Sequence, residues 1–565
     1  MTADDIIFTL WEYRPTAIPI VMSFQNSSSA QHSVVRLEQP RSQYCVGDTL
    51  NVLVEMRNYG GHPKAYGGDF ILARVHSPKL HASASGEVTD LLNGSYRVHF
   101  HLFWPGELQV SVLLIHSSEA VQILQRDWML DYGKAVHKGT FINGSKNESS
   151  HCGLRLITDR PLCEYKKKED GEYFACYQPK TLPCSSLSTM QSYTPRTKEE
   201  PQLLARQNVG IQIQNNFPTV TVIGCAAKVH KPTEKCVAGM NSPFPGGYFY
   251  SNSWSSSFCQ TRPFISEDAI TRCLKGKTVY LFGDSTMRQW IEYLEKLLKG
   301  LKFIQQADPA NAKLAVDAHS NITIWWKKHA HPWISSQSVT NIKILSIPEE
   351  LDSIAVGGRT DVVVVIGVGQ HFRPYPPEVF IRRLLSMRRA ILRLQARSPQ
   401  AQVVIKLENT KELTSMMSHS SDWYGYMNNQ SVRKVFEGLK VVLVDAWDMT
   451  VAANSFAIHP NNIILSNDHR KYYSFFWFTV AGFFTLAERA TLRRPWLAGS
   501  RRFSPSRKTP RKRRRRRNSR ELTRKLRQKL RWSLPVLSVG PRCLTLRHSS
   551  STLRASTPSP PCPLS

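Results

Sequence analysis

The sequence lacks the close cysteine pairs that hold structural zinc. None of its eleven cysteines forms a Cys-x-x-Cys pair, the spacing that usually marks a zinc site, so we expect no metal ion. Nine of the eleven lie between Cys45 and Cys273, at loose spacing. Such a distribution is typical of a disulfide framework formed in an oxidising compartment.

The chain also lacks a hydrophobic run suited to crossing a bilayer. Tyr472–Ala487 is uncharged and rich in aromatics, but it has sixteen residues, and a span needs about twenty. We therefore expect no membrane anchor. The N-terminus lacks a good signal peptide as well, because residues 1–5 (MTADD) are acidic and Glu12, Arg14 and Pro15 interrupt the apolar stretch that follows.

Acidic residues are almost absent from the end of the chain. From Arg489 to Ser565 there are 23 Lys and Arg but one acid, Glu521, so this tail carries most of the net charge of +31. The run Arg511–Arg517 could bind polyanions non-specifically. No zinc finger, helix-turn-helix or aromatic RNA-binding motif accompanies it, and we expect no specific nucleic-acid partner.

Glycosylation sequons are present, and they favour the secretory pathway together with the cysteines. Six Asn-x-Ser/Thr sequences occur, at Asn26, Asn93, Asn143, Asn147, Asn321 and Asn429. We therefore expect a secreted protein, or one of the Golgi or ER lumen. The missing signal peptide keeps a cytosolic protein as the alternative.

The N-terminal part reads as an antiparallel β-sandwich. Alternating apolar residues follow turn signals in three runs: Leu50 to Met56, Tyr96 to Phe100 and Leu108 to Leu114. This pattern predicts an immunoglobulin-like or filamin-like domain over residues 30–130, after a leader (1–29) of unclear role. Residues 131–260 hold most of the cysteines and show little periodicity, so we expect loops tied by disulfides.

Strands and helices alternate from residue 261 to 465, which predicts an α/β domain with a mainly parallel sheet. Expected strands are 279–282, 322–326, 361–367, 402–407 and 440–445; expected helices include 377–397 and 429–438. The chain is therefore expected to be multidomain, with a disordered basic tail over 466–565.

Ser285 is the first candidate for chemistry. Val279–Phe282 predicts a buried strand, Gly283 permits a sharp turn, and apolar residues at helical spacing follow. Ser285 should therefore lie at a helix N-terminus, at the carboxyl end of a strand, where α/β proteins bind ligands. The alternative is that Ser285 only caps the helix.

Two further strand ends supply the groups that a serine nucleophile needs. A glycine-rich turn, Gly367–Phe372, follows one strand; Asp445 and Asp448 follow another, and His459 comes after them. A serine hydroxyl needs a base, usually histidine, and the base needs an orienting carboxylate. The alternative is that these residues belong to plain turns and caps.

These motifs, residues 281–290 (LFGDSTMRQW), 369–374 (GQHFRP) and 444–450 (VDAWDMT), resemble the NXPE family of neurexophilin and PC-esterase domain proteins. The likeness covers residues 30 to 460. It implies a neurexophilin-like first half and a second half on the PC-esterase branch of the GDSL/SGNH esterase fold.

The resemblance implies roles for single residues. Ser285 would be the nucleophile and His459 the base; Ser285 and Gly369 N–H groups, with Gln370 or Arg288, would surround the oxyanion. The implied chemistry is transfer or hydrolysis of acetyl groups on glycan hydroxyls through an acyl-serine. No bound cofactor is implied, although acetyl-CoA could serve as acyl donor. We expect Trp325, Trp326 and Trp423 to flank the cleft.

One departure from the family pattern is important. An acid is expected just before the base, but Ala457 and its neighbours supply none, so Asp445 or Asp448 would have to reach His459. Without that partner, turnover in a triad can fall by about four orders of magnitude. A catalytically weak, neurexophilin-like binding protein with a cell-surface receptor as partner is therefore the alternative function.

Overall fold

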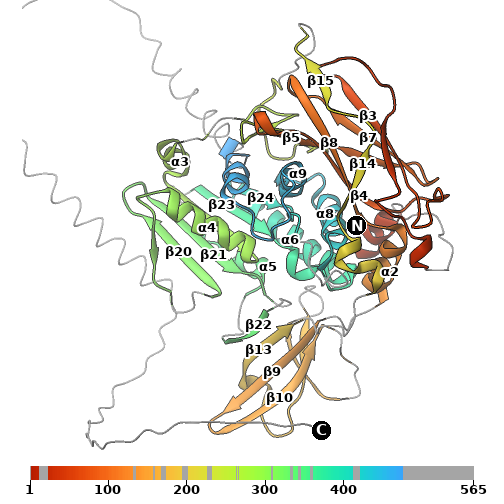
Figure 1. Cartoon of the computed structure of the whole chain (residues 1–565). Coiled ribbons are helices and arrows are strands. Elements are labelled where there is room, and N and C mark those ends of the chain that lie inside the picture. Colours follow the sequence, from red (N-terminus) through yellow and green to blue (C-terminus); the bar gives the residue numbers. More distant parts are fainter. Residues whose placement is uncertain are drawn as a thin grey trace, which may run out of the picture. The chain divides into compact units, whose positions relative to one another are not determined.

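The computed structural model describes residues 2–11, 23–130, 135–154, 156, 160–166, 173–193, 201–225, 232–261, 264, 266–306, 310–330, 335–340, 345–356, 361–411, 420–471 and 473–474 (Figure 1). The chain divides into two units, residues 1–492 and 493–565. Of the expected tail (466–565) the structure describes only residues 466–471 and 473–474. The basic run 511–517 and most of the aromatic run 472–487 therefore lie outside the described residues. In the part that is described, no helix is both long and apolar enough to cross a membrane.

A large N-terminal sheet of twelve strands has the order β17-β16-β5-β4-β8-β14-β1-β3-β7-β6, with β15 pairing with β2 and β8. Its strands are β1 (Val34–Leu37), β2 (Tyr44–Cys45), β3 (Thr49–Glu55), β4 (Phe70–Ser77), β5 (Ala82–Ser85), β6 (Glu87–Asp90), β7 (Ser95–His101), β8 (Gly106–His116), β14 (Ile211–Asn215), β15 (Val220–Ile223), β16 (Gly247–Tyr250) and β17 (Ser253–Ser256).

The alternating runs of the sequence are confirmed as strands of this sheet. Leu50, Val52 and Val54 on β3 are fully buried, and β7 and β8 bury their apolar residues in the same alternation. The expected boundary at residue 130 is wrong, however, because β14 to β17 come from the segment after it.

The segment 131–260 is not made only of loops. A six-stranded sheet has the order β11-β12-β10-β9-β13-β22. Its strands are β9 (Val136–Asn143), β10 (Lys146–Gly153), β11 (Leu162–Lys166), β12 (Phe174–Tyr177), β13 (Leu187–Tyr193) and β22 (Ser335–Thr340). The sequence hid these strands because the cysteines and polar residues of β9 to β12 break the apolar alternation that identifies a half-buried strand.

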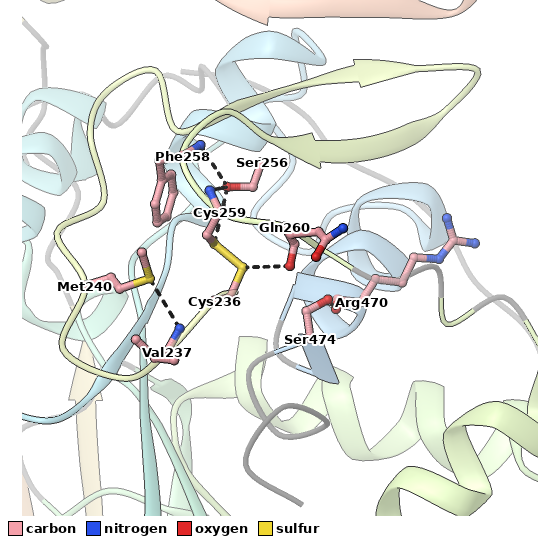
Figure 2. The surroundings of a disulfide bond; sticks show 9 residues. All are labelled: Cys236, Val237, Met240, Ser256, Phe258, Cys259, Gln260, Arg470 and Ser474. Atoms are coloured by element: carbon pink, nitrogen blue, oxygen red, sulfur yellow. Dashed lines mark hydrogen bonds between the residues drawn. A yellow bond between two sulfur atoms is a disulfide. The ribbon is translucent and has the colours of Figure 1, made fainter. Parts of the chain in front are cut away.

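Four disulfides confirm the expected framework: Cys45–Cys225, Cys152–Cys176, Cys163–Cys184 and Cys236–Cys259. The ninth cysteine of the region, Cys273, is a buried free thiol, and burial raises its pKa to about 12. Figure 2 shows Cys236–Cys259 with Gln260, whose carbonyl oxygen lies 3.3 Å from the Cys236 sulfur. This bridge belongs to the hydrophobic core beneath helix α4 (Ser285–Leu297).

The predicted α/β region contains a seven-stranded sheet of order β19-β20-β21-β18-β23-β24-β25. Its strands are β18 (Lys277–Gly283), β19 (Lys302–Ile304), β20 (Ala312–Asp317), β21 (Ile322–Lys328), β23 (Asp361–Gly367), β24 (Gln402–Lys406) and β25 (Val442–Val444). The five strands from β21 to β25 in this order are parallel, and β19 and β20 are antiparallel. A mainly parallel sheet is thus confirmed.

Helices cover both faces of this sheet. On one face, Phe282 and Ile366 join a core with α6 (Pro377–Arg397) and α8 (Asp422–Phe436); on the other, Leu281 and Val365 pack with α4. The remaining helices are α1 (Ala3–Trp11), α2 (Ser118–Leu130), α3 (Glu267–Leu274), α5 (Ile347–Ser353) and α9 (Ala446–Ala452). Residues of the expected leader, Ile6 and Leu10 on α1, also join the first core.

Gly283 makes the turn from β18 to α4 possible. Its φ is +152°, and a Cβ at this position would lie 1.9 Å from the carbonyl oxygen of Gly367 on β23. The next residue continues the contact, because the Asp284 N–H donates to that same oxygen at 3.3 Å. Glycine is therefore required where β18 and β23 end side by side.

We predict that Gly283→Ala lowers the free energy of unfolding by about 2–4 kcal/mol, because the added Cβ forces the two strand ends apart. Urea titration measures the effect. Gly224→Ala is the matched control, since nothing lies within 4 Å of its Cβ, and it should change stability by less than about 0.5 kcal/mol. Equal losses in the two variants would contradict this account.

Candidate active site

Ser285 lies where the order of the parallel strands changes direction. From β18 the chain passes to β21 on one side and then returns to β23 on the other. Loops leaving β18 and β23 therefore separate at their carboxyl ends, which is where open α/β sheets form ligand crevices. Ser285 is the first residue of α4 at this point, and it is partly exposed.

The alternative role of Ser285 as the helix cap is filled by its neighbour. Asp284 is the N-cap of α4, and its carboxylate accepts from the backbone N–H of Thr286 at 2.9 Å and from the Thr286 hydroxyl at 2.7 Å. Asp284 is 2% exposed. The Ser285 hydroxyl is thereby left available for another partner.

That partner is His459. The Nε2 atom of His459 lies 2.9 Å from Ser285 Oγ, although 174 residues separate them in sequence. The imidazole is exposed, whereas Pro460 beside it is buried. The two residues that the sequence suggests as nucleophile and base are thus within hydrogen-bond distance of each other.

The loop that carries His459 is held by amide side chains that sequence reasoning missed. Asn409, which follows β24 and is fully buried, donates from Nδ2 to the carbonyl oxygens of Ala457 at 3.1 Å and Ile458 at 3.2 Å. Gln289 on α4 donates to the Pro460 carbonyl oxygen at 2.8 Å. A helix that carries the serine therefore also fixes the histidine loop.

A buried network of ion pairs around Arg373 holds the backbone of Asn409. Arg373 is fully buried, and its guanidinium donates to Glu408 at 2.8 Å, to Asp422 at 2.9 Å and to the Asn409 carbonyl oxygen at 3.2 Å. Burial raises the pKa values of Glu408 and Asp422, and the guanidinium opposes that rise. The partners of Arg373 lie far from it in the sequence. Sequence patterns therefore could not predict this network.

The two carboxylates predicted to orient His459, those of Asp445 and Asp448, bind other groups instead. Asp445 caps α9 through the Asp448 N–H at 3.0 Å and pairs with Arg433. Asp448 is fully buried; it accepts from the Gly246 N–H at 2.6 Å and from the Ser85 hydroxyl. Neither carboxylate contacts His459 among the described contacts, and we assign both to structural roles.

The chain after His459 is helical at residues 462–471 and 473–474, so the helix continues into the segment that was expected to be a disordered tail from residue 466. Asp468 on this helix is fully buried, with no hydrogen bond to its carboxylate among the described residues. Burial raises its pKa to about 6. No described acid therefore orients His459.

The candidate oxyanion groups fall into two sets. The Ser285 and Gly369 N–H groups have no acceptor among the described contacts, and a Cβ on Gly369 (φ +151°) would lie 2.1 Å from Glu408 Oε1. By contrast, Gln370 donates its amide to the Asn409 carbonyl oxygen at 3.2 Å. Arg288 lies 3.5 Å from Glu292 and over the Trp326 ring, so the backbone groups suit an oxyanion better.

The expected aromatic flank of the cleft is largely wrong. Trp326 is 1% exposed and belongs to the core, whereas Trp325 is partly exposed beneath Lys327. Trp423 packs edge-on against Trp128. Trp423 and Trp128 line a cavity of about 650 Å³, and neither Ser285 nor His459 lines that cavity.

The predicted glycosylation sites separate by exposure. Five of the six asparagines are exposed: Asn26, Asn93, Asn143, Asn147 and Asn321. Asn429 is 3% exposed, and its amide is bonded to the backbone of Glu408 on both sides, at 2.8 and 3.2 Å. Asn429 is therefore a structural residue of the folded chain, and its assignment as a glycan acceptor is corrected.

Two solved structures show a distant likeness to parts of this chain. One is the Escherichia coli adhesin FdeC, with 13% identity, 35% of this chain and 66% of that chain covered, and a TM-score of 0.14. Another is a putative glycoside hydrolase from Bacteroides vulgatus, with 9% identity, coverages of 56% and 53%, and a TM-score of 0.13. Scores this low carry no argument about fold or function.

Family models match both halves of the chain. Residues 18–199 match the model described as neurexophilin, and residues 254–476 match the model described as NXPE family member 4-like, C-terminal domain. The second match extends beyond the expected boundary at 465 and includes the helix after His459. With four disulfides, this domain pair fits a protein of the secretory pathway. The chain belongs to the NXPE family.

Proposed function

We propose that this protein is an O-acyltransferase or acylesterase of the secretory pathway that acts on acetyl groups of glycans through an acyl-serine intermediate. The observation that carries the proposal is the 2.9 Å contact between Ser285 Oγ and His459 Nε2. The position of this pair at the carboxyl edge of a mainly parallel sheet supports an SGNH-type assignment for the second half. The alternation of buried and exposed residues along the strands supports an immunoglobulin-like assignment of the first half.

The proposed reaction has two steps. Ser285 Oγ attacks the acyl carbonyl carbon while its proton passes to His459 Nε2, and the donor oxygen or sulfur leaves with that proton. Water or a sugar hydroxyl then attacks the acyl carbon and gives its proton to His459, which passes that proton to Ser285 Oγ as the bond between the acyl carbon and Oγ breaks. The Ser285 and Gly369 N–H groups would stabilise the oxyanion in both steps. An acyl donor such as acetyl-CoA would be a substrate.

A catalytically weak binding protein is the second candidate. The observation that favours it is the lack of a described carboxylate on His459, since an unoriented base costs a serine enzyme much of its rate. The neurexophilin match over residues 18–199 is consistent with recognition of a cell-surface receptor. The two candidates differ in whether Ser285 is reactive.

A fluorophosphonate probe distinguishes the candidates. We expect the wild-type protein to be labelled at Ser285, and Ser285→Ala to take up no label, because the phosphonate bonds to an activated serine oxygen. His459→Ala should slow labelling by about 10²- to 10⁴-fold, the usual contribution of a general base. Ser185→Ala, which removes an exposed serine, should label normally. A folded wild-type protein that remains unlabelled would favour the binding protein.

Asp448→Asn tests whether this acid serves catalysis or stability. Burial and the neighbouring Asp445 charge raise the pKa of Asp448 to about 7. A group whose pKa is raised in the folded state contributes its full stabilisation below its ordinary pKa. That stabilisation is lost as the pH rises through the folded-state pKa, here about 7. The variant should therefore flatten the decline in unfolding free energy between about pH 5 and 8 by on the order of 2 kcal/mol, while fluorophosphonate labelling stays unchanged.

The matched control is Asp352→Asn. Hydrogen bonds from Arg393 lower the pKa of Asp352, so its contribution is lost as pH falls and cannot produce a decline as pH rises from about 5 to 8. Urea titrations at about pH 5 and about pH 8 measure the free energy of unfolding of both variants. If Asp448→Asn instead abolished labelling while the protein stayed folded, Asp448 would be a partner of His459 after all.

A further inference from the structure

A pair of hydrogen-bonded histidines lies at the same sheet edge as Ser285. His329 follows β21, and its backbone N–H donates to the Gly283 carbonyl oxygen at 3.3 Å. His371 follows β23, within the short 3-10 helix Gln370–Phe372. Since β21 and β23 flank β18, with Gly283 in register with Lys328 and Gly367, both histidines follow strand ends at the edge of the sheet where Ser285 begins α4.

The hydrogen bonds of this pair determine which nitrogens carry protons. His329 Nδ1 lies 2.7 Å from the Ala330 carbonyl oxygen, which can only accept, so Nδ1 carries the proton. His329 Nε2 lies 2.8 Å from His371 Nδ1. In a neutral His329 the Nε2 atom has only a lone pair, so His371 Nδ1 must donate the hydrogen to it.

The outer nitrogen of His371 is then a bare acceptor. Burial lowers the pKa values of both imidazoles to about 3, so both rings are neutral at physiological pH. With its proton on Nδ1, His371 carries a lone pair on Nε2, and no donor to that atom is found among the described contacts. His329 is 3% exposed, whereas His371 is partly exposed, so the outer ring is the one that a ligand can reach.

We propose that His371 Nε2 accepts a hydrogen bond from a second hydroxyl of the acyl acceptor, adjacent to the hydroxyl that reacts, and so selects polyhydroxylated acceptors such as sugars. This inference rests on the proposed function of Ser285. In the second step, the reacting hydroxyl oxygen bonds to the acyl carbon, the bond from that carbon to Ser285 Oγ breaks, and His459 carries the proton between the two oxygens. His371 takes no proton; it is a specificity residue that orients the acceptor.

Two amide variants test the two ring nitrogens of His371 separately. Asn at 371 can place an N–H at the position of Nδ1 and keep the bond to His329, but it has no acceptor at the position of Nε2. Gln at 371 reaches far enough for its oxygen to replace the Nε2 acceptor. His371→Asn should therefore lose the proposed contact, and His371→Gln should restore it in part.

The experiment uses the full chain with p-nitrophenyl acetate as donor. Nitrophenol release reports acylation of Ser285, and mass spectrometry reports acetyl transfer to a methyl glycoside or to 1-propanol, which has one hydroxyl. We expect His371→Asn to lower transfer to the glycoside by about 10- to 100-fold, which corresponds to about 1.4–2.7 kcal/mol for the lost hydrogen bond. Nitrophenol release, fluorophosphonate labelling and transfer to propanol should match wild type.

Each result has one reading. Equal glycoside transfer by wild type and His371→Asn, with both labelled normally, overturns the role of His371. A wild type that neither releases nitrophenol nor takes up label refutes the proposed function instead. If the variants do not fold, ¹⁵N NMR of the wild-type imidazoles decides, since a protonated His371 Nε2 contradicts the proposal and an unprotonated one supports it.

Discussion

The close approach of β18 to β23 is the constraint on which the candidate site depends. Gly283 has no side chain where the carbonyl oxygen of Gly367 lies, and the Asp284 N–H bonds to that oxygen. The serine loop and the glycine-rich loop therefore leave the sheet side by side. Because β21 pairs with the other side of β18, three parallel strand ends lie side by side at one edge of the sheet.

Buried polar groups hold the histidine loop against this crevice. Asn409 and Gln289 donate to three carbonyl oxygens on the two sides of His459, those of Ala457, Ile458 and Pro460. Arg373 in turn donates to the Asn409 carbonyl oxygen, and the buried carboxylates of Glu408 and Asp422 hold Arg373. Breaking a buried ion pair by removing one partner is costly, so the position of His459 is coupled to the stability of the domain.

Local patterns in the sequence predicted the parallel sheet and the Ser285 turn, because buried strands and amphipathic helices depend on neighbouring residues. The bounds of α6, Pro377–Arg397, agree with the predicted helix. The cysteine-rich strands escaped prediction, since disulfides replace the apolar alternation there. The roles of Asp445 and Asp448 could not be predicted either, because their partners Arg433 and Ser85 come from other elements. Motif spacing shows which groups exist, and tertiary contacts determine which of them meet.

The odd cysteine has a consequence for how the chain acquires its bridges. Thiol–disulfide exchange proceeds through the thiolate, and a sulfur with a pKa of about 12 inside a packed core seldom forms one. Once folded, Cys273 therefore leaves the four pairings undisturbed. Before α3 packs, the same sulfur is an ordinary thiol that can take part in exchange, so its burial favours the four pairings.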